Sequence, residues 1–297
     1  MGGPGVSNSS GLWIASEQRN QLIQFTANGG ASPIDLPPQP AGNFPQGVAA
    51  ASDGSIWISE INSVLRVGSD RQVTSFAVQG QPNGRIVQGP DKAIWVTELG
   101  KDRVARIMNE QVHEFSLPSA PVQVQCGGRC PYGIASGPDG NLWITESQLA
   151  AGGLVGRMTL QGEYKNWPLR EAGAALNDIT AGPDQALWFG ESRARGLGRV
   201  TTEGVVTEQV VDLPTHASGT ELVSAGGGLI WYAPSLAPTS SEDPIAVGAA
   251  LPSGASRIYE IAGTKGPVAA VVPMPAPEGL VVDVVTWSGQ IWQGSMS

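Results

Sequence analysis

The chain has 297 residues, including 40 glycines and 23 prolines, and only 14% of its residues are charged. It is too apolar to be disordered and too rich in turn-forming residues to be helical. The net charge of -9 argues against a nucleic acid or an anionic lipid surface as partner, since either needs a basic patch. The sequence has no uninterrupted apolar run of about 18 residues, so we expect no membrane span.

A repeat centred on tryptophan runs through the chain from one end to the other. Leucine or isoleucine precedes a tryptophan at seven positions spaced 38 to 61 residues apart, namely Trp13, Trp57, Trp95, Trp143, Trp188, Trp231 and Trp292. Most of these spacings match the length of one four-stranded propeller blade. The tryptophan is expected to fill the space between neighbouring blades.

The clearest copy of the repeat is residues 130–146, which read Cys-Pro-Tyr-Gly-Ile-Ala-Ser-Gly-Pro-Asp-Gly-Asn-Leu-Trp-Ile-Thr-Glu. A first strand runs from Pro-x-Gly to the Asp-Gly turn, and a second carries the tryptophan and ends at Thr-Glu. A third short apolar segment ends near an arginine, and a fourth closes on Leu-Pro. The arginines are expected to pair with neighbouring carboxylates, and they are Arg106, Arg157, Arg199 and Arg257.

A lone four-stranded unit cannot bury both of its apolar faces, so the units must stack radially. We therefore predict an all-β fold in which residues 1–297 form one domain, a seven-bladed β-propeller of four-stranded antiparallel blades. A six-bladed ring with a composite closure is the alternative. The chain begins with short first and second strands over residues 4–13 and stops just after a strand around Trp292. The last blade should therefore lack its third and fourth strands, unless the N-terminal residues complete it.

Residues 235–255 account for the longest interval and are rich in proline, serine, alanine and glycine. We expect them to be a loop insertion between the second and third strands of the sixth blade, ahead of a third strand at 256–258. A lid over the channel mouth and a disordered insertion are the two interpretations of this segment.

Cys126 and Cys130 enclose a short Gly-Gly-Arg loop, which favours a disulfide that would brace the adjacent Tyr132. Two free thiols are the alternative, and two thiolates cannot complete a tetrahedral zinc site. The first five residues show no signal-peptide pattern, so cytoplasmic and secreted locations both stay open.

Alternating strand directions place the Pro-x-Gly positions and the strand-end glutamates around one mouth of the channel. The x residues are Gln46, Asn83, Tyr132, Asn177 and Glu278, and the glutamates are Glu60, Glu98, Glu146 and Glu191. Carboxylates crowded on one rim raise each other's pKa values or recruit a hard cation such as Mg²⁺ or Ca²⁺. Glu98, Glu146 and Glu191 are the metal candidates. The alternative is that the glutamates recur with the repeat and bond to neighbouring loops.

Acid–base chemistry at this mouth could use two further side chains. His216, on the connection into the sixth blade, is the histidine placed to act as a general base. Tyr132 could donate a proton or stack on a ligand. A solvated loop residue is the plain alternative for His216.

The pattern Pro-x-Gly-Ile, Gly-Pro-Asp-Gly-x-Leu-Trp-Ile-Thr-Glu, Gly-Arg-Ile and Glu-Phe-x-Leu-Pro resembles that of the virginiamycin B lyases. The resemblance runs from about residue 11 to residue 292. It implies a seven-bladed propeller that opens a cyclic depsipeptide antibiotic by elimination, with a divalent cation, usually magnesium. It also implies two catalytic histidines at the x of late Pro-x-Gly motifs, and no x position here is histidine.

Together these observations favour a lyase-like enzyme that acts on a small or cyclic natural product at a carboxylate-lined channel mouth. The reaction is an acid–base elimination or rearrangement, with or without magnesium. The expected catalytic residues are Tyr132, His216, Glu98, Glu146 and Glu191, and the expected ligand-binding residues are Gln46, Glu60, Asn83, Asn177 and Glu278. The alternative is a non-catalytic propeller that binds a ligand or a protein. We expect a monomer with a small-molecule partner.

Overall fold

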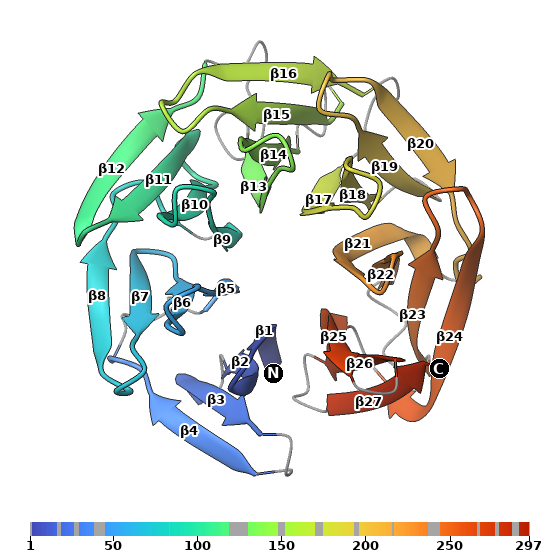
Figure 1. Cartoon of the computed structure of the whole chain (residues 1–297), viewed down its shortest axis with the longest axis horizontal. Coiled ribbons are helices and arrows are strands. Elements are labelled where there is room, and N and C mark those ends of the chain that lie inside the picture. The colour runs from blue at the N-terminus through green and yellow to red at the C-terminus, as the bar shows by residue number, and fades with distance from the viewer. Residues whose placement is uncertain are drawn as a thin grey trace.

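The fold is that of a computed structural model. It describes residues 2–16, 19–26, 30–38, 45–82, 84–118, 130–147, 152–169, 175–192, 196–215, 217–236, 244–265, 268–276, 279–286 and 291–296. All regular elements in these ranges are β-strands, which form seven antiparallel sheets around one channel (Figure 1). None of these residues forms a helix long and apolar enough to cross a membrane.

Each of the first six blades contains four consecutive strands that run from the channel to the outside (Figure 1). Blades one to three consist of β1 (Gly2–Asn8), β2 (Gly11–Ser16), β3 (Gln21–Phe25), β4 (Ala31–Asp35), β5 (Gly47–Ala50), β6 (Ile56–Ser59), β7 (Ser63–Val67), β8 (Val73–Ala77), β9 (Ile86–Gln88), β10 (Ile94–Glu98), β11 (Arg103–Met108) and β12 (Gln111–Ser116). Blades four to six consist of β13 (Pro131–Ser136), β14 (Leu142–Glu146), β15 (Leu154–Met158), β16 (Tyr164–Pro168), β17 (Leu176–Ala181), β18 (Leu187–Glu191), β19 (Gly196–Val200), β20 (Val206–Val210), β21 (Ala217–Gly226), β22 (Leu229–Leu236), β23 (Pro244–Ala250) and β24 (Ser256–Lys265).

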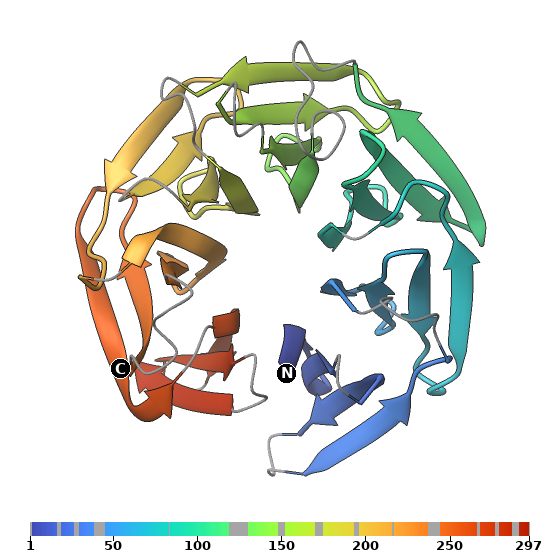
Figure 2. The same cartoon turned by 180° about the vertical axis from the view of Figure 1, so that it is seen from behind.

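The seventh blade has three strands within the described residues: β25 (Val268–Ala276), β26 (Gly279–Thr286) and β27 (Ile291–Met296). Its innermost strand β25 contacts β1, so the first and last blades are neighbours and the ring closes. Figure 2 shows the same closed ring from behind. The structure thus confirms seven blades and excludes the six-bladed alternative.

In blades three, four and five, one aspartate at the turn before the second strand contacts both the tryptophan and the arginine of its blade. In blade five, Asp184 Oδ1 accepts a hydrogen bond from Trp188 Nε1 at 2.9 Å, and Asp184 Oδ2 pairs with Arg199 Nε at 2.7 Å. In blade three, Asp91 makes the same two contacts, with Trp95 at 3.1 Å and Arg106 at 2.8 Å. These contacts tie the turn, the second strand and the third strand together. They confirm the predicted pairing with carboxylates for Arg106, Arg157 and Arg199. Arg257 lies on the fourth strand β24, with its guanidinium carbon 5.3 Å from the centre of the Tyr259 ring.

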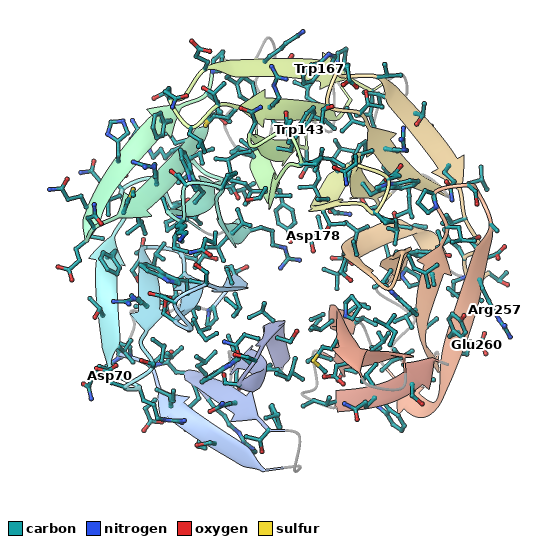
Figure 3. All side chains as sticks on the ribbon, in the orientation of Figure 1. Asp70, Trp143, Trp167, Asp178, Arg257 and Glu260 are labelled. Carbon is teal, nitrogen blue, oxygen red and sulfur yellow. The ribbon has the colours of Figure 1, made fainter. Side chains whose placement is uncertain are left out.

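The hydrophobic core lies between blades rather than within them. Seven buried clusters each draw residues from two neighbouring blades, and one of them joins the first blade to the last. The tryptophans are at the centre of these layers: Trp95, Trp143 and Trp188 are fully buried. In four blades the tryptophan also packs on an aromatic residue of the fourth strand, as Trp143 stacks on Trp167 with ring centroids 5.3 Å apart (Figure 3).

Two expectations about the C-terminal region were wrong. Trp292 lies on the third strand β27, and in the second strand β26 the corresponding position is Val281. Residues 235–255 are not one loop, because Pro244–Ala250 form β23 and the segment from Ser256 is the fourth strand β24. The repeat motif is degenerate here: Trp231 faces Ala249 where the middle blades place an arginine. The N-terminal residues form β1 and β2 of their own blade, as the short first unit predicted.

Replacing Trp143 by alanine should lower the free energy of unfolding by about 3–5 kcal/mol, because it empties a fully buried site between two blades. Trp292→Ala serves as the control, since this tryptophan is 36% exposed and its removal should cost far less. Urea unfolding followed by circular dichroism measures both values. Equal losses for the two variants would contradict the packing role of the repeated tryptophan.

Candidate functional site

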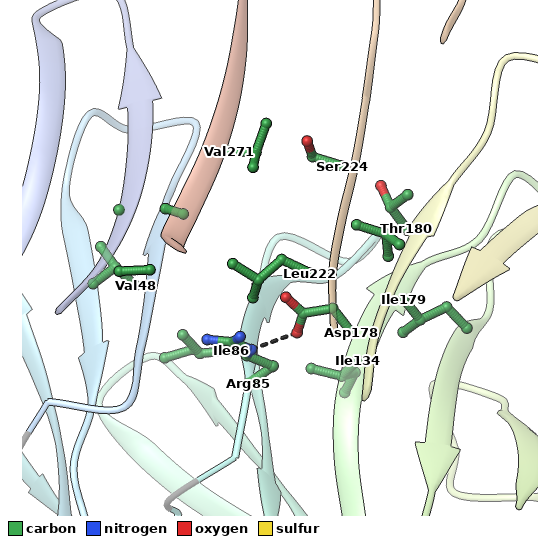
Figure 4. A pocket seen from close by; sticks show the side chains of 14 residues that line it. Val48, Arg85, Ile86, Ile134, Asp178, Ile179, Thr180, Leu222, Ser224 and Val271 are labelled. Atoms are coloured by element: carbon green, nitrogen blue, oxygen red, sulfur yellow. Dashed lines mark hydrogen bonds and ion pairs between the residues drawn. The ribbon is translucent and has the colours of Figure 1, made fainter. Parts of the chain in front are cut away.

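The central channel holds a cavity of about 190 Å³ to which all seven blades contribute. Most of its lining residues are aliphatic, with Val48, Ile134 and Leu222 among them. Two charged side chains, Arg85 and Asp178, also line it (Figure 4). A cavity in which a few polar groups converge between aliphatic side chains is typical of a small-molecule site.

Arg85 and Asp178 form an ion pair that links blades three and five. Arg85 Nε donates a hydrogen bond to Asp178 Oδ1, and Arg85 Nη1 donates to the carbonyl oxygen of Gln46 in blade two at 3.2 Å. The guanidinium carbon lies 5.4 Å from the centre of the Tyr132 ring in blade four, a cation–π distance. One arginine therefore contacts three other blades.

The electrostatic environment of this cluster keeps Arg85 charged and raises the pKa values of the acidic groups around it. Burial opposes the charge of Arg85, but Asp178, Tyr132 and Glu221 outweigh it and raise the arginine's pKa. Burial raises the pKa of Asp178, and the nearby guanidinium opposes only part of that effect. Burial also raises the pKa of Glu221, with Arg85 opposing and Asp178 adding to the shift. Glu221 lies on β21. Surrounding protein atoms raise its pKa, and the residue nevertheless remains exposed to solvent.

Tyr132 is the sequence-predicted residue that the structure brings into this cluster. The Arg85 guanidinium lowers the pKa of its hydroxyl, but burial and the carboxylates Asp178 and Glu221 together raise it. The phenol therefore stays protonated at neutral pH and can donate a hydrogen bond. Gln46 contributes its carbonyl oxygen to Arg85. Asn177 is used between blades instead, because its amide donates to the Thr220 carbonyl at 3.2 Å.

We predicted that the start of the first strand of a blade lies next to the end of its second strand. The strand register confirms this prediction. Pro131 pairs with Glu146, and Leu176 pairs with Glu191. The hydroxyl residue before Glu60, Glu98 and Glu146 holds neighbouring blades together. Ser59 Oγ donates to the Gly84 carbonyl at 2.9 Å, Thr97 Oγ1 to the Tyr132 carbonyl at 2.6 Å, and Thr145 Oγ1 to the Asn177 carbonyl at 2.5 Å. The Ser/Thr-Glu motif is therefore a link between blades.

The four repeated glutamates are buried at this rim and do not line the channel cavity. Glu60 Oε2 accepts a hydrogen bond from Ser63 Oγ at 2.8 Å, which matches the structural interpretation of this residue. Glu98, Glu146 and Glu191 each end the second strand of a different blade. Within the described residues, no group of three or more His, Cys, Asp or Glu side chains is arranged to hold a metal ion. The three metal candidates therefore do not converge on one ion.

Glu98 has a strongly perturbed environment. It is fully buried, and neither of its carboxylate oxygens has a hydrogen-bond partner among the described residues. Burial raises its pKa to about 7, Glu114 adds to that shift and Arg103 opposes it. Arg103 Nη1 is committed to Glu114 Oε2 at 2.7 Å, which limits its help to Glu98.

Four predicted site residues, Asn83, Cys126, His216 and Glu278, lie outside the described residues. Their roles, including the Cys126–Cys130 disulfide, stay predictions. The other histidine, His113, lies on the outer strand β12, where its ring packs edge-on against Phe115 at 4.5 Å. It is therefore far from the channel wall formed by the innermost strands.

Sequence reasoning missed Arg85, Asp178 and Glu221. The sequence does carry a partial signal. Arg85 directly precedes Ile86, and Asp178 directly precedes Ile179. Each of these isoleucines pairs with the residue that follows the tryptophan of its blade. In the neighbouring blades this position is glycine, at Gly47 and Gly133. The sequence shows a charged residue where other repeats have glycine. It does not show that Arg85 pairs with Asp178, because the two residues lie 93 positions apart.

Comparisons with known proteins are consistent with this architecture. The model of the virginiamycin B lyase family matches residues 5–129 and 86–262. The virginiamycin B lyase of Nocardia farcinica is 32% identical over 182 residues, which cover 60% of this chain and 59% of that protein. The virginiamycin B lyase of Saccharopolyspora erythraea is 35% identical over 105 residues, or 35% of this chain and 31% of that protein. The chain thus matches less than two thirds of the length of these relatives.

Solved structures extend the likeness over nearly the whole ring. A catalytically inactive histidine-to-alanine variant of virginiamycin B lyase from Staphylococcus aureus, crystallised with quinupristin, superposes with a TM-score of 0.82. The identity is 25%, and the match covers 98% of this chain and 94% of that one. A streptogramin B lyase structure gives the same TM-score at 23% identity, over 98% and 92% of the two chains, and supports the fold alone.

Glu98→Gln should remove a pH-dependent loss of stability. Because the folded pKa of about 7 lies above the ordinary value of 4.5, Glu98 favours the folded state at low pH. That contribution is lost as the pH rises towards and through 7. Relative to the wild type, Glu98→Gln should therefore gain roughly 1–3 kcal/mol between pH 5 and pH 8 in urea unfolding. The exposed Glu208→Gln on β20 is the control, and an equal pH dependence in all three proteins would refute the assignment.

A double-mutant cycle tests the ion pair across the channel. Arg85→Met and Asp178→Asn should each cost roughly 1–3 kcal/mol of unfolding free energy, because each leaves a partly buried polar partner behind. The double variant should cost clearly less than the sum of the two. Additive losses in urea unfolding would mean that the two side chains act independently.

Proposed function

The chain belongs to the virginiamycin B lyase family, and on this premise we propose that it is a lyase acting on a small or cyclic natural product at the mouth of the channel. The reaction that fits acid–base groups is an elimination. A base removes a proton from the carbon next to a carbonyl, the bond between the neighbouring carbon and an ester oxygen breaks, and a carbon–carbon double bond and a free carboxylate form. No water is consumed, so a ring is opened without a change in mass.

Glu221, Tyr132 and Arg85 support this proposal through complementary properties. Glu221 is solvent-exposed, and its raised pKa makes it a stronger base than an ordinary glutamate. Tyr132 keeps its proton and can hydrogen-bond to a carbonyl or a leaving oxygen. Arg85 supplies a fixed positive charge that stabilises the anion formed when the proton leaves. Arg85 lines the channel cavity, and its contact with the Tyr132 ring together with its electrostatic interaction with Glu221 is the observation that carries the proposal.

Two sequence predictions are kept as part of the proposal and await a test. His216 directly precedes β21, the strand that bears Glu221, so it remains a candidate base. Magnesium dependence, expected from the family, does not fit the buried glutamates at Glu98, Glu146 and Glu191, and we route no step through a metal. Calorimetric titration with Mg²⁺ and Ca²⁺ tests for a cation site elsewhere.

The substrate class is tested with quinupristin, the compound named with the Staphylococcus aureus structure. Incubation with the wild type should yield a linear product of unchanged mass, which mass spectrometry distinguishes from hydrolysis because hydrolysis adds one water. Glu221→Gln should lower kcat about 10²–10⁴-fold, while the exposed Glu208→Gln leaves it unchanged. The rate should rise with pH through a pKa above the ordinary glutamate range, since the base must be deprotonated.

A ligand-binding propeller without chemistry is the second candidate. Two observations favour it. None of the Pro-x-Gly positions carries a histidine, and His113 lies on an outer strand, away from the channel. Binding of quinupristin with no change in its structure over long incubation would support this candidate and contradict the lyase. Binding and turnover that are both insensitive to Glu221→Gln would remove the channel mouth as the site.

A further inference from the structure

Arg85 and Asp178 have hydrogen-bonding groups that no described residue uses. Arg85 donates from Nε to Asp178 Oδ1 and from Nη1 to the carbonyl oxygen of Gln46. Within the described residues, Arg85 Nη2 and Asp178 Oδ2 form no hydrogen bond. Both side chains line the channel cavity, and Figure 4 shows the second carboxylate oxygen of Asp178 directed into it. The cavity wall therefore offers an N–H donor and an oxygen acceptor to a ligand.

Charge decides which kind of group this wall accepts. A carboxylate would be attracted by Arg85 but repelled by Asp178 and by the nearby Glu221, and an ammonium group would be repelled by Arg85. The other polar side chains of the lining, Thr180 and Ser224, carry no charge. A neutral group avoids both repulsions. A carboxamide is neutral and combines a carbonyl acceptor with an NH2 donor, so it complements the two groups of the ion pair.

The size of the cavity restricts it to one substituent of a ligand. Its volume of about 190 Å³ lies below the roughly 300–1,000 Å³ of pockets that hold a whole small molecule. Residues from all seven blades surround it, so a group enters end-first, along the channel. The aliphatic side chains of the lining, among them Val48, Ile134 and Leu222, suit a short hydrocarbon stem. A macrocycle would stay at the mouth and insert a projecting side chain.

We propose that Arg85 and Asp178 form a recognition site for a terminal carboxamide on a short aliphatic stem, the chemistry of a glutamine side chain. The carbonyl oxygen of the ligand accepts a hydrogen bond from Arg85 Nη2, and its NH2 group donates to Asp178 Oδ2. As a statement about the substrate, this inference rests on the proposed lyase function, because it selects macrocycles that carry such a side chain. Binding of the carboxamide itself does not require turnover.

Butyramide is the probe, since it is a carboxamide on a short propyl stem. Titration followed by methyl NMR of Val48, Ile134 and Leu222 should give a dissociation constant of about 1–10 mM, as expected for a small fragment. Butyrate and butylamine keep an aliphatic stem but carry a charged end, and each should bind at least about tenfold more weakly. N,N-dimethylbutyramide, which lacks the N–H donors, should lose a similar factor.

Asp178→Asn should reverse the preference between butyramide and butyrate. The asparagine carbonyl oxygen still accepts from Arg85 Nε, so an NH2 donor replaces Oδ2 and one negative charge is removed. Butyramide should then bind about tenfold more weakly than to the wild type, and butyrate about tenfold more tightly. Glu208→Gln makes the same change of charge at an exposed position of β20 and should alter neither affinity. Arg85→Met removes the donor and should weaken butyramide binding about tenfold or more.

The inference is overturned if butyramide shifts no channel methyl signal at about 100 mM, or if the wild type binds butyrate as tightly as butyramide. Both measurements use the wild type alone, so they decide the question even where a variant fails to fold. Unchanged selectivity in an Asp178→Asn protein that circular dichroism shows to be folded also contradicts it. Turnover of quinupristin without butyramide binding would refute this site and leave the lyase proposal intact, whereas butyramide binding without turnover would do the reverse.

Discussion

The aspartate shared by a tryptophan and an arginine is the contact on which each middle blade depends. In blade four, Asp139 accepts a hydrogen bond from Trp143 at 3.0 Å and lies 3.7 Å from Arg157. The indole can then sit fully buried between blades without an unsatisfied N–H group, since a buried donor without a partner would cost about 1–3 kcal/mol. The same carboxylate aligns the turn with the second and third strands. Local chemistry and stacking between blades are therefore coupled through one side chain.

The side chains that line the channel are not organised by the aspartate–tryptophan–arginine contact of the blades. The innermost strands supply small and aliphatic side chains, and Arg85 with Asp178 breaks that pattern by joining blades three and five. Such a pair forms only when the ring is closed, because its members come from blades that are not neighbours. A closed ring thus holds a cation, a phenol and two carboxyl groups close to one another at the channel.

The repeated glutamates show how a correct topology can mislead about accessibility. The register confirmed that strand starts and strand ends meet at one rim, at Pro131 with Glu146. The side chains nevertheless turn into the protein, so Glu146 is fully buried. The hydroxyls of Thr97 and Thr145 hold the next blade by its main chain, and this close contact leaves little open space for the adjacent glutamates.

The all-β class, the number of blades and the strand order of the middle units could be predicted from the sequence, because each follows from local periodicity and turn chemistry within one repeat. The repeat also singled out Tyr132, whose ring packs against Arg85. The contact of Arg85 with Asp178, the burial of the glutamates and the place of Trp292 on a third strand became known only from the three-dimensional fold. These features depend on contacts between distant repeats or on a degenerate copy, where the local pattern no longer specifies side-chain direction or register.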